Sequence, residues 1–165
     1  MHNKVVHYLA KTFNNHGYAS IRFNFRGVGQ SEGHYGNGLG ETEDALSVYD
    51  WTRAHLENQP IWLAGFSFGS YIALNCSSQR KAAGLITIAP AVNLLDFRSL
   101  SSPGAPWLMV HGDKDEVVPI HDAMDWYNHL ALKPQLELMP DASHFFHGRL
   151  NDLRDKVNHF LLGKV

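Results

Sequence analysis

The chain has 165 residues, of which 44% are hydrophobic and 18% are charged, a balance typical of one globular domain and not of a disordered chain. The formal net charge of −2 argues against nucleic acid or an anionic membrane surface as a partner. No apolar run approaches the length of a membrane span and no signal peptide opens the sequence. We therefore expect a cytoplasmic protein whose single domain occupies residues 1–165.

Short apolar segments alternate with amphipathic segments along the chain, and turn residues separate them. The alternation predicts, in order, helix 3–16, strand 18–25, a glycine-rich loop over 26–40, helix 41–56, strand 61–66, a helix ending near 79, strand 84–89, an irregular link over 91–105, strand 106–111, helix 121–132, strand 135–139 and helix 148–162. Strands that alternate with helices favour an α/β fold, with a mostly parallel sheet of about five strands covered on both faces.

Residues 65–69 read G-F-S-F-G and join a predicted buried strand to a predicted buried helix. This pattern matches the G-x-S-x-G nucleophile elbow, whose strained turn exposes the serine hydroxyl at the C-terminal edge of a sheet. We expect Gly65 and Gly69 to be required, because side chains there would collide as strand and helix close on each other. The amide N–H of Phe68, at the start of the helix, is a candidate oxyanion donor above Ser67.

An acid and a base for this serine should come from loops at the same edge of the sheet. Two loops qualify, because residues 112–119 follow one predicted strand and residues 140–147 follow the last one. The order serine, acid, histidine is that of α/β-hydrolases. Asp115 lies 48 residues after Ser67, and His144 lies 29 residues after Asp115, so folding alone could bring them together. Asp113 is an alternative acid.

Over essentially its whole length the chain resembles the small bacterial serine α/β-hydrolases, a group related to dienelactone hydrolases and short-chain esterases. G-D-K-D-E-V-V-P matches the family's G-x-x-D-x-x-V-P motif, S-H-F-F-H-G matches its histidine loop, and F-R-G-V-G-Q-S-E-G is similar to its loop after an early strand. The resemblance implies an α/β-hydrolase fold and a catalytic triad of Ser67, Asp115 and His144, acting without a cofactor.

Other residues near these motifs have alternative interpretations. Asp113 lies nearer the strand end and off the motif position, so it is the weaker candidate for the acid. We interpret His147 as a structural partner of a loop carbonyl and His111 as a core histidine. Asp141 stands where the family often has glycine, and aspartate tolerates a left-handed backbone.

Metal and nucleotide sites are disfavoured by spacing. The H-x-D-x-D and H-x-x-H patterns formed by His111, Asp113, Asp115, His144 and His147 match no standard zinc signature, so we expect no metal. The G-V-G at 27–29 lacks the third glycine of a dinucleotide fingerprint, and no Walker pattern is present. The single cysteine, Cys76, is expected to pack inside the helix after the elbow.

Members of this family have further strands before the helix that opens this chain, and a loop after one of them supplies a second oxyanion donor. The resemblance therefore implies an N-terminally truncated fold, from a fragment, a misassigned start or a truncated paralogue. A family strand would lie between strands 18–25 and 61–66. Strand 18–25 could slide across to fill the gap, or a second chain could fill it in a homodimer. Loss of one oxyanion donor typically costs about a hundred- to a thousandfold in turnover, so we expect weakened catalysis.

The link at 91–105 is where this fold often carries a lid, and about fifteen residues allow a minimal one. A shallow cleft lined by Phe68, Phe145, Phe146 and residues of the 91–105 link would suit small esters or thioesters, although the aromatic residues are as readily explained as core. We therefore predict a carboxylesterase-like serine hydrolase with a small ester as substrate. The competing interpretations are a non-catalytic truncated protein that binds a ligand or a partner chain, and a peptidase by fold analogy alone.

Overall fold

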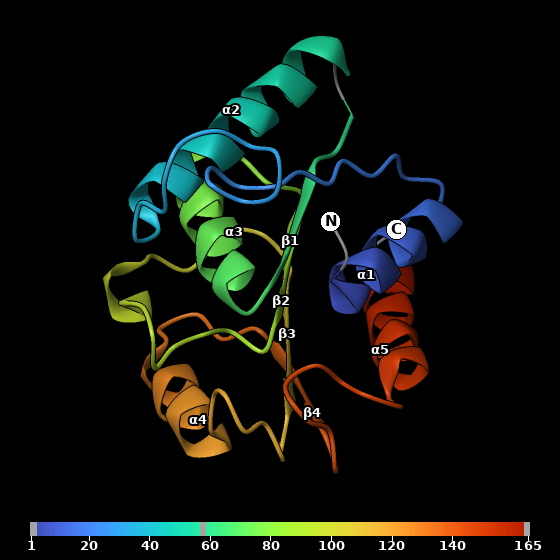
Figure 1. Ribbon diagram of the computed structural model, residues 1–165. Coiled ribbons are helices and arrows are strands. Elements are labelled where there is room, and N and C mark those ends of the chain that lie inside the picture. The colour runs from blue at the N-terminus through green and yellow to red at the C-terminus, as the bar shows by residue number, and fades with distance from the viewer. Residues whose placement is uncertain (1–2, 57–58, 164–165) are drawn as a thin grey trace.

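The computed structural model describes residues 3–56 and 59–163, and places helices on both faces of a parallel sheet (Figure 1). Its elements are α1 (Lys4–Asn15), α2 (Leu39–His55), β1 (Trp62–Phe66), α3 (Phe68–Gln79), β2 (Gly84–Ile88), the 3-10 helix η1 (Phe97–Ser99), β3 (Trp107–Gly112), α4 (Ile120–His129), β4 (Gln135–Met139) and α5 (Leu150–Leu162). The predicted alternation is confirmed except at residues 18–25. In the described residues no helix is long and apolar enough to cross a membrane.

The sheet has four strands in the described part of the chain, in the order β1-β2-β3-β4 and all parallel. The register aligns their carboxyl ends, because Phe66 pairs with Ile88 and Ile88 pairs with Val110. The loops that leave the strands therefore gather at one edge of the sheet. This is the predicted α/β-hydrolase architecture, with four strands where about five were expected.

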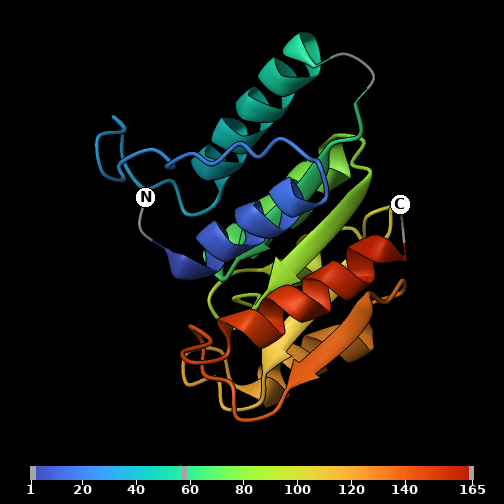
Figure 2. The same cartoon turned by 90° about the vertical axis from the view of Figure 1, so that its right-hand side faces the viewer.

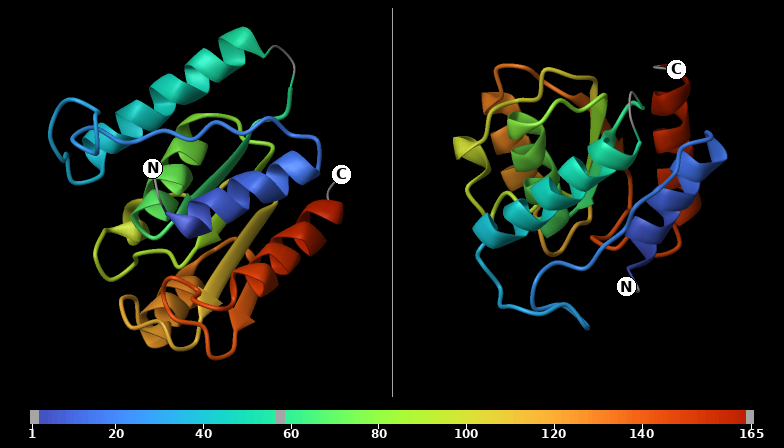
Figure 3. Two further views of the ribbon diagram at one scale, coloured as in Figure 1. Left: turned by 45° about the vertical axis from the view of Figure 1, so that its right-hand side comes forward. Right: turned by 90° about the horizontal axis from the view of Figure 1, so that it is seen from above.

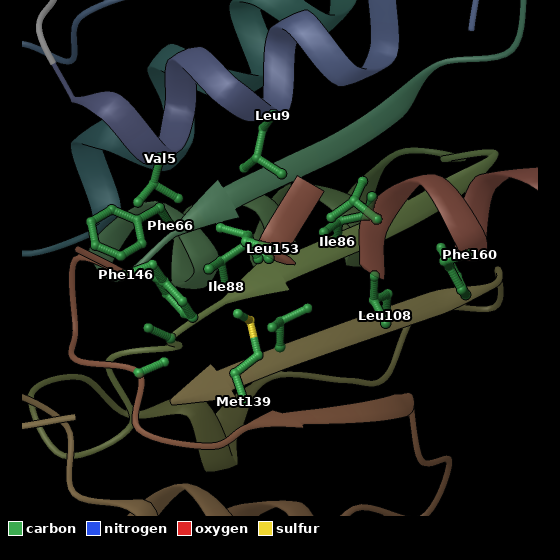
Figure 4. Close-up of a cluster of buried hydrophobic side chains, with 14 of the residues drawn as sticks. Val5, Leu9, Phe66, Ile86, Ile88, Leu108, Met139, Phe146, Leu153 and Phe160 are labelled. Atoms are coloured by element: carbon green, nitrogen blue, oxygen red, sulfur yellow. The ribbon is translucent and has the colours of Figure 1, made fainter. Parts of the chain in front are cut away.

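Successive residues of the central strands point to opposite faces and build two cores. On β2, Leu85 faces one cluster and Ile86 the other, and both are fully buried. Helices α1 and α5 cover one face, while α2, α3 and α4 lie on the other (Figures 1, 2 and 3). Figure 4 shows the core beneath α1 and α5. Burial on both faces explains why these strands read as continuous apolar runs.

Residues 18–25 form no strand, so this prediction was wrong. The segment crosses beyond β1 from the α1 side of the sheet to the α2 side (Figure 1). Tyr18 packs on the core beneath α1, where the centroid of its ring lies 5.7 Å from that of Phe13. Phe25 packs on the core on the opposite face of the sheet. A chain that runs across a sheet edge cannot form a hydrogen-bonded ladder along it. Its apolar residues are instead anchored at two separate points.

Cys76 lies on α3 and is fully buried, as predicted. Burial raises the pKa of its thiol to about 11. Because the thiolate is the reactive form of cysteine, this side chain acts as a packing residue at neutral pH.

Candidate active site

The elbow at the end of β1 holds Ser67 in a strained conformation. Its φ of 54° and ψ of −116° are rare for a residue with a side chain. The backbone around it is fixed by the Ser67 N–H, which donates to the Ile88 carbonyl at 2.8 Å. A strained nucleophile turn held by the neighbouring strand is what the motif predicts.

The two elbow glycines have different structural roles. A Cβ added to Gly65 would lie 2.6 Å from the Ser70 nitrogen and would overlap the carbonyl group of Gly69. A Cβ added to Gly69 would meet no atom within 4 Å. The requirement predicted for Gly65 is therefore confirmed, whereas the one predicted for Gly69 was wrong, because its own Cα faces open space.

Ser67, His144 and Asp115 form a continuous hydrogen-bonded chain above the sheet edge. His144 Nε2 lies 3.0 Å from Ser67 Oγ, and His144 Nδ1 lies 2.8 Å from Asp115 Oδ2. His144 and Asp115 are 2% and 6% exposed. Because the carboxylate only accepts, the ring proton sits on Nδ1, and Nε2 is free to accept the hydroxyl proton of Ser67. The geometry is that of a nucleophile, a base and an orienting acid.

The Asp115 carboxylate is held ionised by its hydrogen bonds. Its Oδ1 accepts from the N–H groups of Val117 at 2.9 Å and Val118 at 2.7 Å. Burial by itself raises the pKa of Asp115, but the hydrogen bonds from His144, Val118 and Val117 outweigh it, and the net pKa lies below the ordinary value. An ionised acid at neutral pH is the form that can stabilise a positively charged imidazole.

Hydrogen bonds from backbone N–H groups to side-chain carboxylates join the acid loop, residues 112–119, to the base loop, residues 140–147. Asp113 Oδ1 accepts from the Asp141 N–H at 2.7 Å, and Glu116 Oε2 accepts from the His144 N–H at 3.1 Å. Asp113 is therefore a loop partner, and the His144 ring binds Asp115 instead. Asp141 adopts a φ of 56°, the left-handed backbone that was expected there. The contact of Glu116 was not predicted, because its acceptor role depends on folding and no motif marks it.

The remaining histidines near the site lie in different environments. His147 is exposed and its ring lies beside that of Phe145, with centroids 5.9 Å apart, rather than on a loop carbonyl. His111 is fully buried, as predicted, and its Nε2–H donates to the Val118 carbonyl at 2.9 Å. Within the described residues, no group of three or more His, Cys, Asp or Glu side chains is arranged to hold a metal ion.

The aromatic residues predicted to line a cleft divide into two groups. Phe145 is 44% exposed, and the centroid of its ring lies 5.1 Å from that of His144. Phe68 is the first residue of α3, and its ring packs against those of Phe25 and Tyr35. Phe146 is fully buried in the core beneath α1 and α5 (Figure 4), so the prediction that it contacts substrate was wrong. Its φ of 53° turns the chain so that its ring points away from Phe145 and into that core.

The buried His111 is expected to make the stability of the fold depend on pH. Burial lowers the pKa of His111, and this outweighs the opposing effects of the Val118 carbonyl and the Asp115 carboxylate. Below about pH 6.5 the unfolded chain binds a proton on this residue that the folded chain does not. The free energy of unfolding should therefore fall as the pH drops from 6.5 towards the folded pKa, by at most about 1.4 kcal/mol per pH unit.

Urea unfolding at several pH values between about 7 and 5, for the wild type and for His111→Gln, would measure this contribution. The slope below pH 6.5 should be shallower in the variant. Asp115 does not interfere. The stability that comes from its lowered pKa is fully present at higher pH and is lost only as the pH falls below about 3.9. Equal slopes in both proteins would contradict the assignment to His111.

Comparison with protein families agrees with this geometry. Residues 1–101 match the family model described as serine aminopeptidase, S33. An uncharacterized protein from Rickettsia prowazekii is 34% identical over 172 residues, which cover 98% of this chain and 72% of that protein.

Two solved structures are also similar. An α/β serine hydrolase homologue from Coxiella burnetii is 46% identical, with a TM-score of 0.92 over 96% of this chain and 76% of that one. An α/β serine hydrolase without lid from Xanthomonas campestris is 42% identical, with a TM-score of 0.94 over 98% of this chain and 73% of that one. The chain thus spans about three quarters of the length of these proteins.

Proposed function

The chain belongs to the serine aminopeptidase S33 family of hydrolases, and we propose that it cleaves small carboxylic esters or thioesters through an acyl-enzyme on Ser67. The observation that carries the proposal is the hydrogen-bonded chain from Ser67 Oγ through His144 to Asp115. A serine hydroxyl is a weak nucleophile until a base takes its proton, and this arrangement supplies the base together with the acid that orients it.

The reaction proceeds in two halves. His144 Nε2 takes the Ser67 hydroxyl proton as Oγ attacks the ester carbonyl, and the imidazolium then gives that proton to the departing alcohol or thiol. The N–H of Phe68 has no acceptor within its own helix, because Phe68 is the first residue of α3. It is available to the oxyanion. In the second half, His144 deprotonates a water that attacks the acyl group and frees Ser67.

Two features support a small, partly apolar substrate. Exposed aromatic surface lies beside His144, from Phe145, and Tyr35 adds more against Phe68, the residue that follows Ser67. The link between β2 and β3 packs onto the protein, because Phe97 in η1 is 1% exposed within the core beneath α3 and α4. A link anchored in this way covers little of the sheet edge, so no deep cover for a long lipid chain is expected.

The test is turnover of p-nitrophenyl acetate together with labelling by a fluorophosphonate, which reacts with an activated serine. Ser67→Ala should abolish labelling and lower kcat by about a millionfold, to background. Ser78→Ala, which alters an exposed serine near the end of the same helix, should behave as the wild type. Labelling or turnover that survives Ser67→Ala would contradict the assignment.

The same probe distinguishes the competing functions. A protein that binds a ligand or partner chain without turnover would remain unlabelled in the wild type. An aminopeptidase would be labelled but would prefer an aminoacyl p-nitroanilide to the acetate ester. We favour the esterase because an ester needs no site for a free amino group.

A further inference from the structure

His111 lies at the carboxyl end of β3, close to the acid of the triad, and its side chain is completely buried. Its Nε2 lies 2.9 Å from the Val118 carbonyl oxygen and 3.7 Å from Asp115 Oδ2. A carbonyl oxygen only accepts hydrogen bonds, so the ring proton sits on Nε2. The distance to Asp115 is too long for a hydrogen bond, so the ring stands beside the carboxylate without binding it.

The other ring nitrogen of His111, Nδ1, has no hydrogen-bond partner in the described part of the chain. Protonation would add a buried N–H there without an acceptor and would bury a positive charge, and this cost exceeds the attraction of the nearby Asp115 carboxylate. The groups that act on the ring are the Val118 carbonyl, the Asp115 carboxylate and the His144 imidazole. Burial lowers the pKa of His111, so the ring is neutral at neutral pH.

Val118 connects the His111 ring to Asp115. Its carbonyl accepts from His111, while its N–H donates to Asp115 Oδ1 at 2.7 Å, a shorter bond than the 2.9 Å one from Val117. The Val118 side chain is fully buried, which restricts its movement. Holding the Val118 carbonyl therefore fixes the residue that carries the shorter backbone bond to the acid.

We propose that His111 is a positioning residue for the acid of the triad, and that its neutral ring holds Val118 so that the Asp115 carboxylate faces His144. The inference rests on the proposed function, in which Asp115 orients the base. It explains why a histidine occupies a site where one ring nitrogen is left without a partner. An aliphatic side chain would avoid that cost but could not hold the carbonyl.

His111→Leu removes the N–H donor, while His111→Gln retains an amide N–H that can reach the same carbonyl. With p-nitrophenyl acetate, His111→Leu should lower kcat by about tenfold with KM within about twofold, and His111→Gln should restore kcat to within about threefold of the wild type. Loss in kcat alone, with rescue by glutamine, is the signature of a misplaced acid and not of a damaged substrate site.

The matched control is Thr87→Val, which removes a different fully buried side-chain donor, a hydroxyl that donates to the Leu108 carbonyl and accepts from Trp107 Nε1. It should lower stability but leave kcat unchanged, because Thr87 contacts no member of the triad. A folded His111→Leu protein with kcat within about twofold of the wild type would overturn the proposal. So would a folded His111→Gln protein as slow as His111→Leu.

Nitrogen-15 NMR of the wild type, labelled at histidine, tests the same idea without any variant. The His111 resonances should show a neutral ring at about pH 7, with the proton on Nε2 and with Nδ1 unprotonated. A protonated ring or the opposite tautomer would overturn the proposal. This measurement is independent of turnover, so failure of the proposed function, seen as a wild type without esterase activity, remains distinguishable from failure of the role of His111.

Discussion

Asp115→Asn is expected to lower kcat by about ten thousandfold while KM changes little. The amide oxygen of asparagine would take the place of Oδ1, since the N–H groups of Val117 and Val118 both require an acceptor there. The amide nitrogen would then face His144 Nδ1, which binds Oδ2 in the native protein. Two donors cannot pair, so the ring proton would move to Nε2, and the imidazole could no longer accept the proton of Ser67.

Steady-state kinetics with p-nitrophenyl acetate, and the rate of fluorophosphonate labelling, would measure this effect. Asp113→Asn is the matched control, because it keeps an oxygen acceptor for the Asp141 N–H and lies outside the Ser67–His144–Asp115 chain. Its kcat should stay within about threefold of the wild type. A folded Asp115→Asn protein that keeps more than about a tenth of the wild-type kcat would show that Asp115 does not orient the base.

Gly65→Ala is expected to destabilise the fold by at least about 3 kcal/mol. The added Cβ would overlap the carbonyl group of Gly69 and approach the Ser70 nitrogen to 2.6 Å. All of these are backbone atoms at the start of α3, so no flexible side chain can move aside. The elbow would have to open, which would break the contact of the Ser67 N–H with the Ile88 carbonyl.

Gly69→Ala provides the comparison, because it adds the same methyl group four residues later, where nothing lies within 4 Å. Alanine is preferred over glycine inside a helix, so this variant should be about 0.5–1 kcal/mol more stable than the wild type. Urea unfolding monitored by circular dichroism would measure both. If the two variants had the same stability, steric contact would not be the reason for glycine at position 65.

The parallel sheet and the meeting of Ser67, Asp115 and His144 could be predicted because local patterns determine them. A buried strand of a parallel sheet is apolar on both faces, and its periodicity ends at a turn, as in the segments before Ser67 and before Asp113. Parallel strands send all following loops to one edge. The order of three short motifs therefore placed the loops that follow two distant strands beside Ser67, and the position of Asp115 in the family motif selected it over Asp113.

Features that depend on a partner elsewhere in the fold could not be predicted in this way. Residues 18–25 are apolar enough for a strand, but a strand also needs a hydrogen-bonding neighbour, and their path across the edge beyond β1 provides none. Phe145 and Phe146 have the same side chain and differ only in backbone direction, which the sequence does not mark. The hydrogen bond from the His144 N–H to Glu116 uses a backbone donor, which every residue except proline has, so no residue pattern predicts it.

The hydrogen bonds between the acid loop and the base loop have a consequence for the second half of the proposed reaction. His144 is held through its Nδ1 by Asp115 and through its backbone N–H by Glu116, and neither contact involves Ser67. When the serine oxygen is occupied by an acyl group, the imidazole loses one contact but keeps these two. The ring would then already be aimed at the space that an incoming water must enter, so deacylation would require no rebuilding of the base.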